Sequence, residues 1–87
     1  MMSHHALTRA QKRSIPPLAI DLLFECGASC SAGGGTEMLY FDKRAWKRVG
    51  RMAGRDAQRH SNWRDVYLIV KEGTIITTGW RTERIRH

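Results

Sequence analysis

Residues Asp65–Trp80 read DVYLIVKEGTIITTGW, and this stretch carries the clearest structural pattern in the chain. Two runs rich in Val, Ile, Thr and Tyr, 66–70 and 74–78, flank the pair Glu72-Gly73. Such side chains fit a pleated strand. Glycine takes the positive φ of a tight turn at little cost, whereas a glutamate does not. The stretch therefore predicts a β-hairpin.

A two-residue loop would divide this hairpin into two faces, because successive strand residues point to opposite sides of a sheet. One face is then expected to carry Val66, Leu68, Val70, Ile75, Thr77 and Gly79. The other face is expected to carry Tyr67, Ile69, Ile76, Thr78 and Trp80. A one-residue slip of register would exchange the two faces.

Two helices are expected ahead of the hairpin. Ser3 is a good N-cap for the first, from His4 to about Arg13. Ile15 should end it, because a residue before proline disfavours helical geometry. The second helix, Pro17–Cys26, begins with a proline whose missing N–H costs nothing in a first turn. It is apolar nearly all round, so it should be largely buried.

Residues 27–35, GASCSAGGG, are predicted to form a flexible connection. A phosphate-binding loop would need a strand before it and a Lys-Ser/Thr pair after it, and this stretch has neither. Thr36–Phe41 alternates as a third strand. Asp42 should cap a helix to about Gln58, with a break at Gly54 as the alternative. The apolar residues of that helix, which should face the sheet, are Trp46, Val49, Ala53 and Ala57.

The chain has 87 residues, near the lower size limit for a self-sufficient core, and should form one domain, 1–87. Its elements predict an α+β fold with two N-terminal helices, a strand, a basic helix and a C-terminal β-hairpin. The three strands should form a small, mainly antiparallel sheet with helices on one face, followed by a basic tail, 81–87. A homodimer that buries more apolar surface would stabilise so small a domain.

No membrane span, metal or cofactor is expected. No apolar run approaches the ~20 residues needed to cross a bilayer. The N-terminus, MMSHHALTRAQKRS, lacks the apolar middle region of a secretion signal, so the cytoplasm is the expected compartment. Cys26 and Cys30 do not make a disulfide framework, and a structural zinc site would need two more ligands at a suitable spacing.

The net charge of +7 is concentrated in residues 43–60, which hold seven of the fifteen Lys and Arg and a single acid. Six of these cations recur at three- and four-residue steps, so they should line the side of the helix opposite its apolar residues: Arg44, Lys47, Arg48, Arg51, Arg55 and Arg59. Like charges at that spacing repel one another. Such a helix favours an anionic partner, whereas a merely solvated face usually alternates the two signs.

Nucleic acid, RNA in particular, is the leading partner, because phosphate contacts from Lys and Arg give affinity through counterion release. Trp80 could add a stacking platform for a base, and Arg84 further charge. An acidic protein would satisfy the same surface. A membrane surface is disfavoured, because the apolar side of the helix is needed against the sheet.

Four segments resemble a family of small bacterial proteins of unknown function. They are H-A-x-x-R-x-x-x-R-x-I from His5 to Ile15, G-G-x-E-x-x-Y-F-D from Gly34 to Asp42, D-x-Y-x-I-V from Asp65 to Val70 and R-T-E-R-I-R from Arg81 to Arg86. That family is placed near the RelE/ParE-like toxins, small α+β proteins that include ribosome-dependent mRNA interferases and gyrase inhibitors. Many members of the family that this chain resembles have His-Arg where this chain has Trp80-Arg81, so one imidazole that could act in catalysis is absent here.

Cleavage of RNA through its 2′-OH needs proton transfer and positive charge near the phosphorane-like transition state. His5 is the best acid or base, Arg9, Arg13 and Arg81 could hold a phosphate, and Tyr67 could supply a phenol. Each residue also has a structural interpretation. His5 could be a surface residue, the first two arginines could pair with Asp21, Glu25 or Glu37, and Tyr67 could lie half in the core.

The sequence thus predicts a cytoplasmic bacterial protein that binds RNA through the basic helix and the open sheet face. It resembles RelE/ParE-like toxins, and endoribonuclease activity is one interpretation of its candidate site. A non-enzymatic module that docks on an acidic protein, such as an antitoxin or a subunit partner, is the first alternative. A plain structural dimer is the second.

Overall fold

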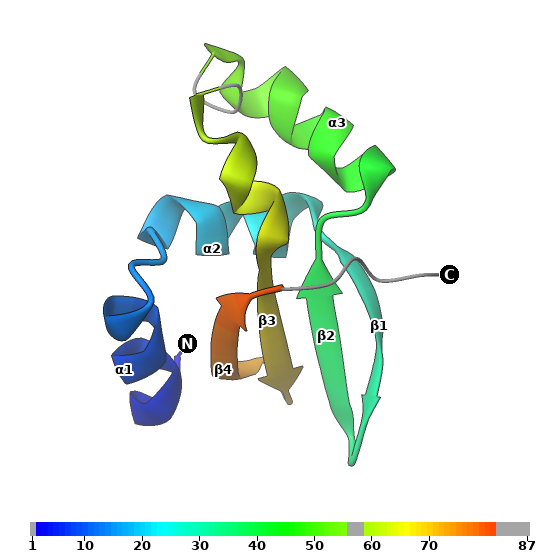
Figure 1. Cartoon of the computed structure of the whole chain (residues 1–87). Coiled ribbons are helices and arrows are strands. Elements are labelled where there is room, and N and C mark those ends of the chain that lie inside the picture. The colour runs from blue at the N-terminus through cyan, green and yellow to red at the C-terminus, as the bar shows by residue number, and fades with distance from the viewer. Residues whose placement is uncertain (1, 56–58, 82–87) are drawn as a thin grey trace.

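A computed structural model of the chain describes residues 2–55 and 59–81 (Figure 1). Its elements follow the chain in this order: α1 (His4–Lys12), α2 (Pro17–Cys26), β1 (Ala28–Gly33), β2 (Thr36–Tyr40), α3 (Lys43–Ala53), the short 3₁₀ helix η1 (Ser61–Asp65), β3 (Val66–Lys71) and β4 (Thr74–Trp80). The predicted α+β class is confirmed, and the two N-terminal helices lie within one residue of their predicted bounds.

The sheet differs from the prediction by one strand. In the described part of the chain it is a four-stranded antiparallel meander in the order β1-β2-β3-β4. The segment predicted to be a flexible connection supplies β1, which pairs with β2 from Ala28↔Tyr40 to Gly33↔Thr36. Gly34 and Gly35 have φ of 58° and 74°, so they form the tight turn of a second hairpin.

The predicted C-terminal hairpin is confirmed, with Glu72 (φ 49°) and Gly73 (φ 79°) at its turn. Two positive φ values in a two-residue loop define a type I′ turn, whose twist matches that of the strands. The pairing runs Val70↔Ile75 and then Ile69↔Thr77, so Ile76 is an extra residue in a β-bulge.

This bulge corrects the predicted faces of β4. Beyond it, Thr78 lies opposite Leu68 and Trp80 opposite Val66, on the face that also carries Ile75. Thr78 is completely buried there, and its hydroxyl donates to the carbonyl oxygen of Tyr67 at 2.8 Å. The sequence assigned Thr77 and Gly79 to this face instead, because alternation counted from the turn takes no account of an inserted residue.

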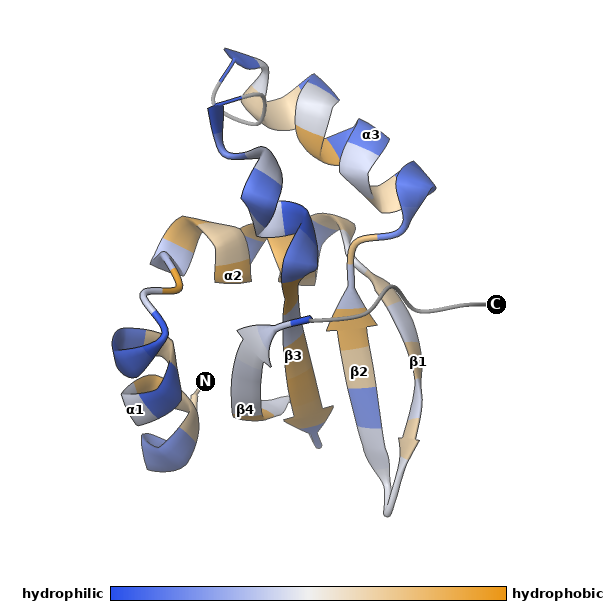
Figure 2. Ribbon diagram, viewed as in Figure 1, coloured by the Kyte–Doolittle hydropathy of each residue, from blue (hydrophilic) through white to orange (hydrophobic). Residues whose placement is uncertain are grey.

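Helix α2 crosses the inner face of the sheet and builds the core (Figure 1). Leu23 of α2, Val66 and Leu68 of β3 and Val49 of α3 all have an exposed fraction of 0%. Figure 2 shows β3 coloured hydrophobic along most of its length, as expected for a central strand buried against a helix. The expected burial of α2 is largely confirmed, although Leu18 and Phe24 remain 47% and 46% exposed.

Helix α1 covers the outer edge of β4. The backbone N–H of Ser3 donates to the carbonyl oxygen of Ile75 at 2.8 Å. Farther along, Nε of Arg9 donates to the carbonyl oxygen of Thr78 at 3.1 Å, and Nε1 of Trp80 donates to that of Arg13 at 2.7 Å. The bonds from Ser3 and Arg9 satisfy carbonyl groups of β4 that an edge strand otherwise presents to another chain, and the bond from Trp80 ties the end of α1 to the end of β4.

Helix α3 packs against α2, whereas the sequence predicted that its apolar side would face the sheet (Figure 1). Val49 is fully buried, and the ring of Trp46 meets Phe41 edge-on with centroids 5.3 Å apart. The helix ends at Ala53, where Gly54 has φ 55°, which bears out the alternative of a break there. Ala57 and Gln58 lie outside the described residues.

None of the helices in the described part of the chain is both long enough and apolar enough to cross a membrane.

Replacing Leu23 with Ala should lower the free energy of unfolding by about 2–5 kcal/mol, because it leaves a cavity between α2 and the sheet. Leu18→Ala on the same helix is the matched control, and its half-exposed side chain predicts a change within about 0.5 kcal/mol. Urea unfolding measures both variants. Equal losses at the two positions would contradict the described packing of α2.

Glu72→Asn should stabilise the hairpin by up to about 1 kcal/mol, because a left-handed backbone is strained for Glu and better tolerated by Asn in a type I′ turn. Lys71→Asn, one residue earlier in β3, should give no gain, since Asn is a poor strand residue. Thermal unfolding compares the two. A Glu72→Asn protein that melts below the wild type would mean that the turn has another geometry.

Candidate nucleic-acid interface

A group of cations lies on the outer side of α3. The Asp42 side chain caps this helix by accepting from the backbone N–H of Ala45 at 2.7 Å. The helical repeat then turns Ala45 and Val49 inward, where they are 2% and 0% exposed. Four exposed cations line a shallow groove on the other side, and we call them the basic ridge: Arg44, Lys47, Arg48 and Arg51.

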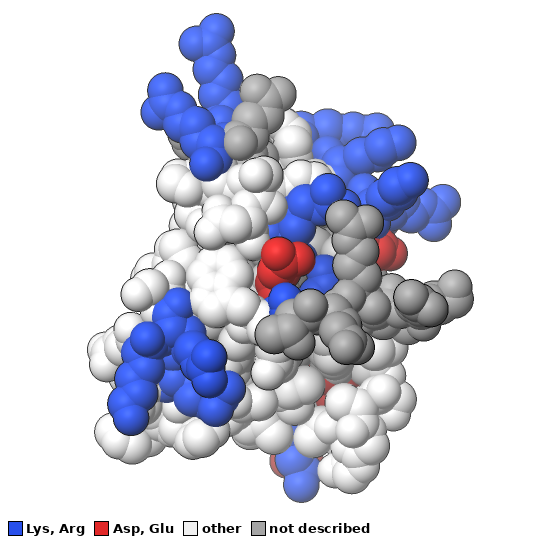
Figure 3. All heavy atoms as spheres, viewed as in Figure 1, with Lys and Arg blue, Asp and Glu red and all other residues white. Residues whose placement is uncertain are grey.

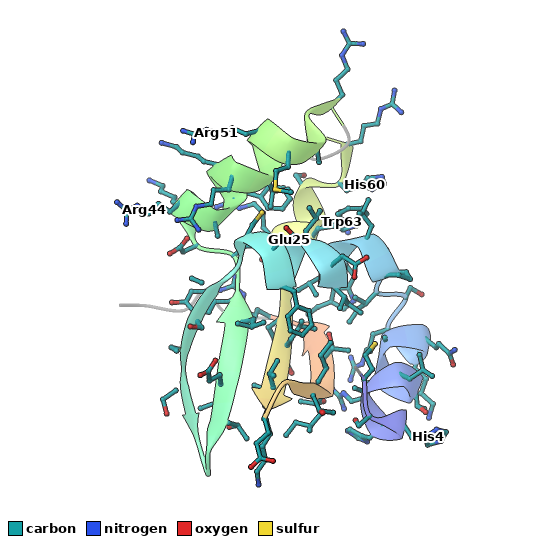
Figure 4. The ribbon with its side chains drawn as sticks, turned by 180° about the vertical axis from the view of Figure 1, so that it is seen from behind. His4, Glu25, Arg44, Arg51, His60 and Trp63 are labelled. Atoms are coloured by element: carbon teal, nitrogen blue, oxygen red, sulfur yellow. The ribbon has the colours of Figure 1, made fainter. Side chains whose placement is uncertain are left out.

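Further cations extend the ridge. Arg55 follows the break at Gly54, and Arg59 precedes η1, and both side chains are exposed. Figure 3 shows Lys and Arg atoms gathered at the upper end of the molecule, where Figure 1 places α3. In Figure 4, seen from behind, Arg44 and Arg51 point away from the body of the protein.

The basic ridge is not neutralised by nearby acids. Among the residues that the structure describes, no carboxylate forms an ion pair with any of its four side chains. Asp42 is engaged as the helix cap. Like charges at i, i+4 therefore repel one another without a direct ion pair to a described carboxylate.

An imidazole lies beyond the C-terminal end of α3. The ring of His60 stacks on the indole of Trp63, with centroids 4.4 Å apart and planes 7° apart. Trp63 is 6% exposed, whereas His60 is exposed. In a 3₁₀ turn, side chains three residues apart eclipse one another, which explains the stack. The sequence did not predict the stack of His60 on Trp63, because no local pattern in residues 59–65 indicates a 3₁₀ turn.

Arg81, predicted to hold a phosphate, lies instead at the centre of a backbone junction. Its Nη2 donates to the carbonyl oxygens of Phe41 and Arg64, at 3.2 and 2.7 Å. Its guanidinium carbon lies 5.7 Å from the centroid of the Tyr40 ring, and its backbone N–H donates to Asp65. The side chain thereby ties together the ends of β2, η1 and β4.

Arg9, Arg13 and Trp80 contribute to the seam between α1 and β4. The guanidinium of Arg9 bonds a backbone carbonyl of β4 and none of the carboxylates proposed as partners. The carbonyl of Arg13 accepts from the indole of Trp80, whose ring is partly buried against the core. Trp80 is therefore poorly placed as a platform for a base.

The candidate catalytic residues do not converge on one point. Ser3 is bonded to Ile75 and Arg13 to Trp80, so α1 runs alongside β4 in the same direction. His5 therefore lies near the beginning of β4, whereas Arg81 follows its end. The rise from Ile75 to Arg81 is about 20 Å, too far for His5 and Arg81 to hold one phosphate.

Tyr67 and Arg84 complete the set of predicted residues. The phenol of Tyr67 lies over Gly79, on the face of the sheet opposite α2. A Cβ added to this glycine would lie 3.0 Å from the hydroxyl oxygen of Tyr67, so the ring packs closely on the strand. Arg84 lies outside the described residues.

Two weakly acidic side chains near the basic ridge, Cys26 and Tyr40, have raised pKa values. Burial raises the pKa of the Cys26 thiol, and Glu25 adds to this effect while Arg48 opposes it. A protonated thiol is a poor nucleophile, so Cys26 does not behave as an activated cysteine. Burial also raises the pKa of the Tyr40 phenol. Within residues 2–55 and 59–81, no group of three or more His, Cys, Asp or Glu side chains is arranged to hold a metal ion.

Arg81→Ala should lower the free energy of unfolding by about 2–3 kcal/mol, because it leaves the carbonyls of Phe41 and Arg64 without a charged donor. Arg59→Ala removes an equal charge from an exposed position and should change it by less than about 0.5 kcal/mol. Urea unfolding separates the two. A wild-type midpoint for Arg81→Ala would show that the junction does not depend on this side chain.

Comparison of the chain with protein-family models, with curated protein sequences and with solved structures finds no match. The resemblance to the small bacterial family and to RelE/ParE-like toxins therefore stays a prediction from the sequence.

Proposed function

We propose that this chain binds RNA through the basic ridge of α3. The observation that carries the proposal is the exposure of four cations on one side of a capped helix whose other side is buried at Ala45 and Val49, with no ion pair to a carboxylate in the described residues. Lys and Arg that neutralise phosphates release condensed counterions, and this release supplies affinity without readout of sequence.

The arrangement of the charge favours this function over a merely solvated surface. A solvated helix face usually mixes both signs, since i, i+4 pairs of opposite charge stabilise a helix and like pairs destabilise it. The described part of α3 carries Lys43 and the four cations of the basic ridge, and no acid. A polyanion removes this repulsion, so binding would stabilise the helix as well as the complex.

We propose binding without cleavage. Arg9 and Arg81 bond to backbone carbonyls, and His5 lies at the opposite end of β4 from Arg81. Acid–base catalysis of phosphoryl transfer needs these groups within hydrogen-bond reach of one phosphate. Of the activities that the resemblance to RelE/ParE-like toxins implies, we therefore propose RNA binding and not RNA cleavage.

The double variant Arg48→Ala/Arg51→Ala tests the basic ridge. For a single-stranded RNA of mixed sequence, the logarithm of affinity should fall with the logarithm of salt concentration between about 50 and 200 mM. Losing two phosphate contacts should make that slope shallower by about 1.4. Fluorescence anisotropy of a labelled strand measures both slopes.

Lys12→Ala/Lys71→Ala is the matched control, because it removes the same net charge from exposed positions on α1 and β3. It should leave the slope within about 0.3 of the wild type, since those side chains make no phosphate contact. Equal losses in the two double variants would attribute binding to net charge and not to the ridge. Unchanged RNA affinity in the ridge variant, with loss of an acidic protein partner, would favour the docking module.

A further inference from the structure

The stack of His60 on Trp63 has the form of a platform with one free side. One face of the imidazole is covered by the indole at 4.4 Å, yet the residue as a whole is exposed. Figure 4 shows His60 and Trp63 side by side near the end of α3, while Arg44 lies at its beginning. A flat ring that packs on an indole through one face, in a residue exposed to solvent, suits stacking of a further planar group.

The platform is fixed in position by the fold. Trp63 is 6% exposed, and its backbone N–H donates to the carbonyl oxygen of His60 at 2.9 Å. The indole therefore restricts the orientation of the imidazole before any ligand arrives. A side chain that is already ordered loses little rotamer freedom on binding, which favours affinity.

The platform lies beyond the C-terminal end of the charged helix (Figure 4). The eleven residues of α3 rise about 16 Å. Its cations begin at Arg44, and the exposed Arg55 and Arg59 carry the charge to the residue directly before His60. A ligand that lies along the basic ridge therefore has backbone charges to place on the helix and a planar group to place at its end.

From this juxtaposition we infer that the ligand is single-stranded RNA, and that one of its unpaired bases stacks on the free face of His60. The inference rests on the proposed function, and it narrows the ligand from RNA in general to single-stranded RNA. Bases in a duplex are paired and stacked on one another, whereas bases in a single strand can be splayed out onto an aromatic side chain.

Other rings close to the ridge do not offer such a surface. Trp46 is partly buried and meets Phe41 edge-on, and Tyr40 is 6% exposed beneath Arg81. Phe24 is exposed, but it lies on α2 and lines an apolar groove toward α1, away from the ridge.

Two variants that both cover Trp63 separate stacking from packing. His60→Phe keeps a planar face, and His60→Leu keeps apolar contact without one. Base–aromatic stacking contributes about 1–3 kcal/mol per base, so His60→Leu should weaken binding of a mixed-sequence single-stranded RNA by about tenfold or more. His60→Phe should bind that strand within about threefold of the wild type. His4→Leu, an exposed histidine on α1, is the matched control and should bind like the wild type.

Inorganic polyphosphate and the same RNA annealed to its complement serve as anions without a free base. Both should bind His60→Leu as they bind the wild type, with an unchanged salt slope. A wild-type protein that binds neither polyphosphate nor RNA would overturn the proposed function itself. A His60→Leu protein that binds single-stranded RNA as tightly as the wild type would overturn only the stacking inference. So would equal losses in His60→Phe and His60→Leu.

Discussion

The packing of α2 between the sheet and α3 is the constraint on which the proposed binding surface depends. Leu23 faces the sheet side of the core and Val49 closes the core from α3, and both are fully buried. Because α3 packs against α2 and not on a strand, it stands above the end of the sheet (Figure 1). Its charged side and the residues that follow it are thereby presented together at one end of the molecule.

Several of the described arginines differ in what their guanidinium groups meet. Arg9 and Arg81 donate to backbone carbonyls, one along the outer edge of β4 that α1 covers and the other where β2, η1 and β4 end. Such bonds satisfy backbone acceptors that would otherwise lose water on burial. The basic ridge has no acceptor of this kind within the described chain. The number of arginines alone therefore does not indicate a binding surface. The atoms that each guanidinium contacts separate structural arginines from those available to a ligand.

Local chemistry made the helix starts predictable. The Ser3 and Asp42 side chains accept from the backbone N–H groups of Ala6 and Ala45, as their identity as caps predicts. Strand β1 was not predictable, because its small residues carry no strand signal and its glycines become a turn only once β2 is beside it. The bulge at Ile76 and the stack of His60 likewise depend on backbone geometry that no side-chain pattern encodes. The sequence shows the cations of the basic ridge, but it does not show whether they form ion pairs with carboxylates.

The two parts of the proposed surface act on different terms of the binding free energy. Charge on the basic ridge supplies affinity that any phosphate backbone can use, and that affinity weakens as salt rises. Stacking on His60 is short-ranged and depends on an accessible base, so it distinguishes a single strand from a duplex while accepting every base. Readout of sequence would need side chains aimed at base edges, and the basic ridge itself consists of Lys and Arg only. If both proposals hold, this protein would select its ligand by strandedness and not by sequence.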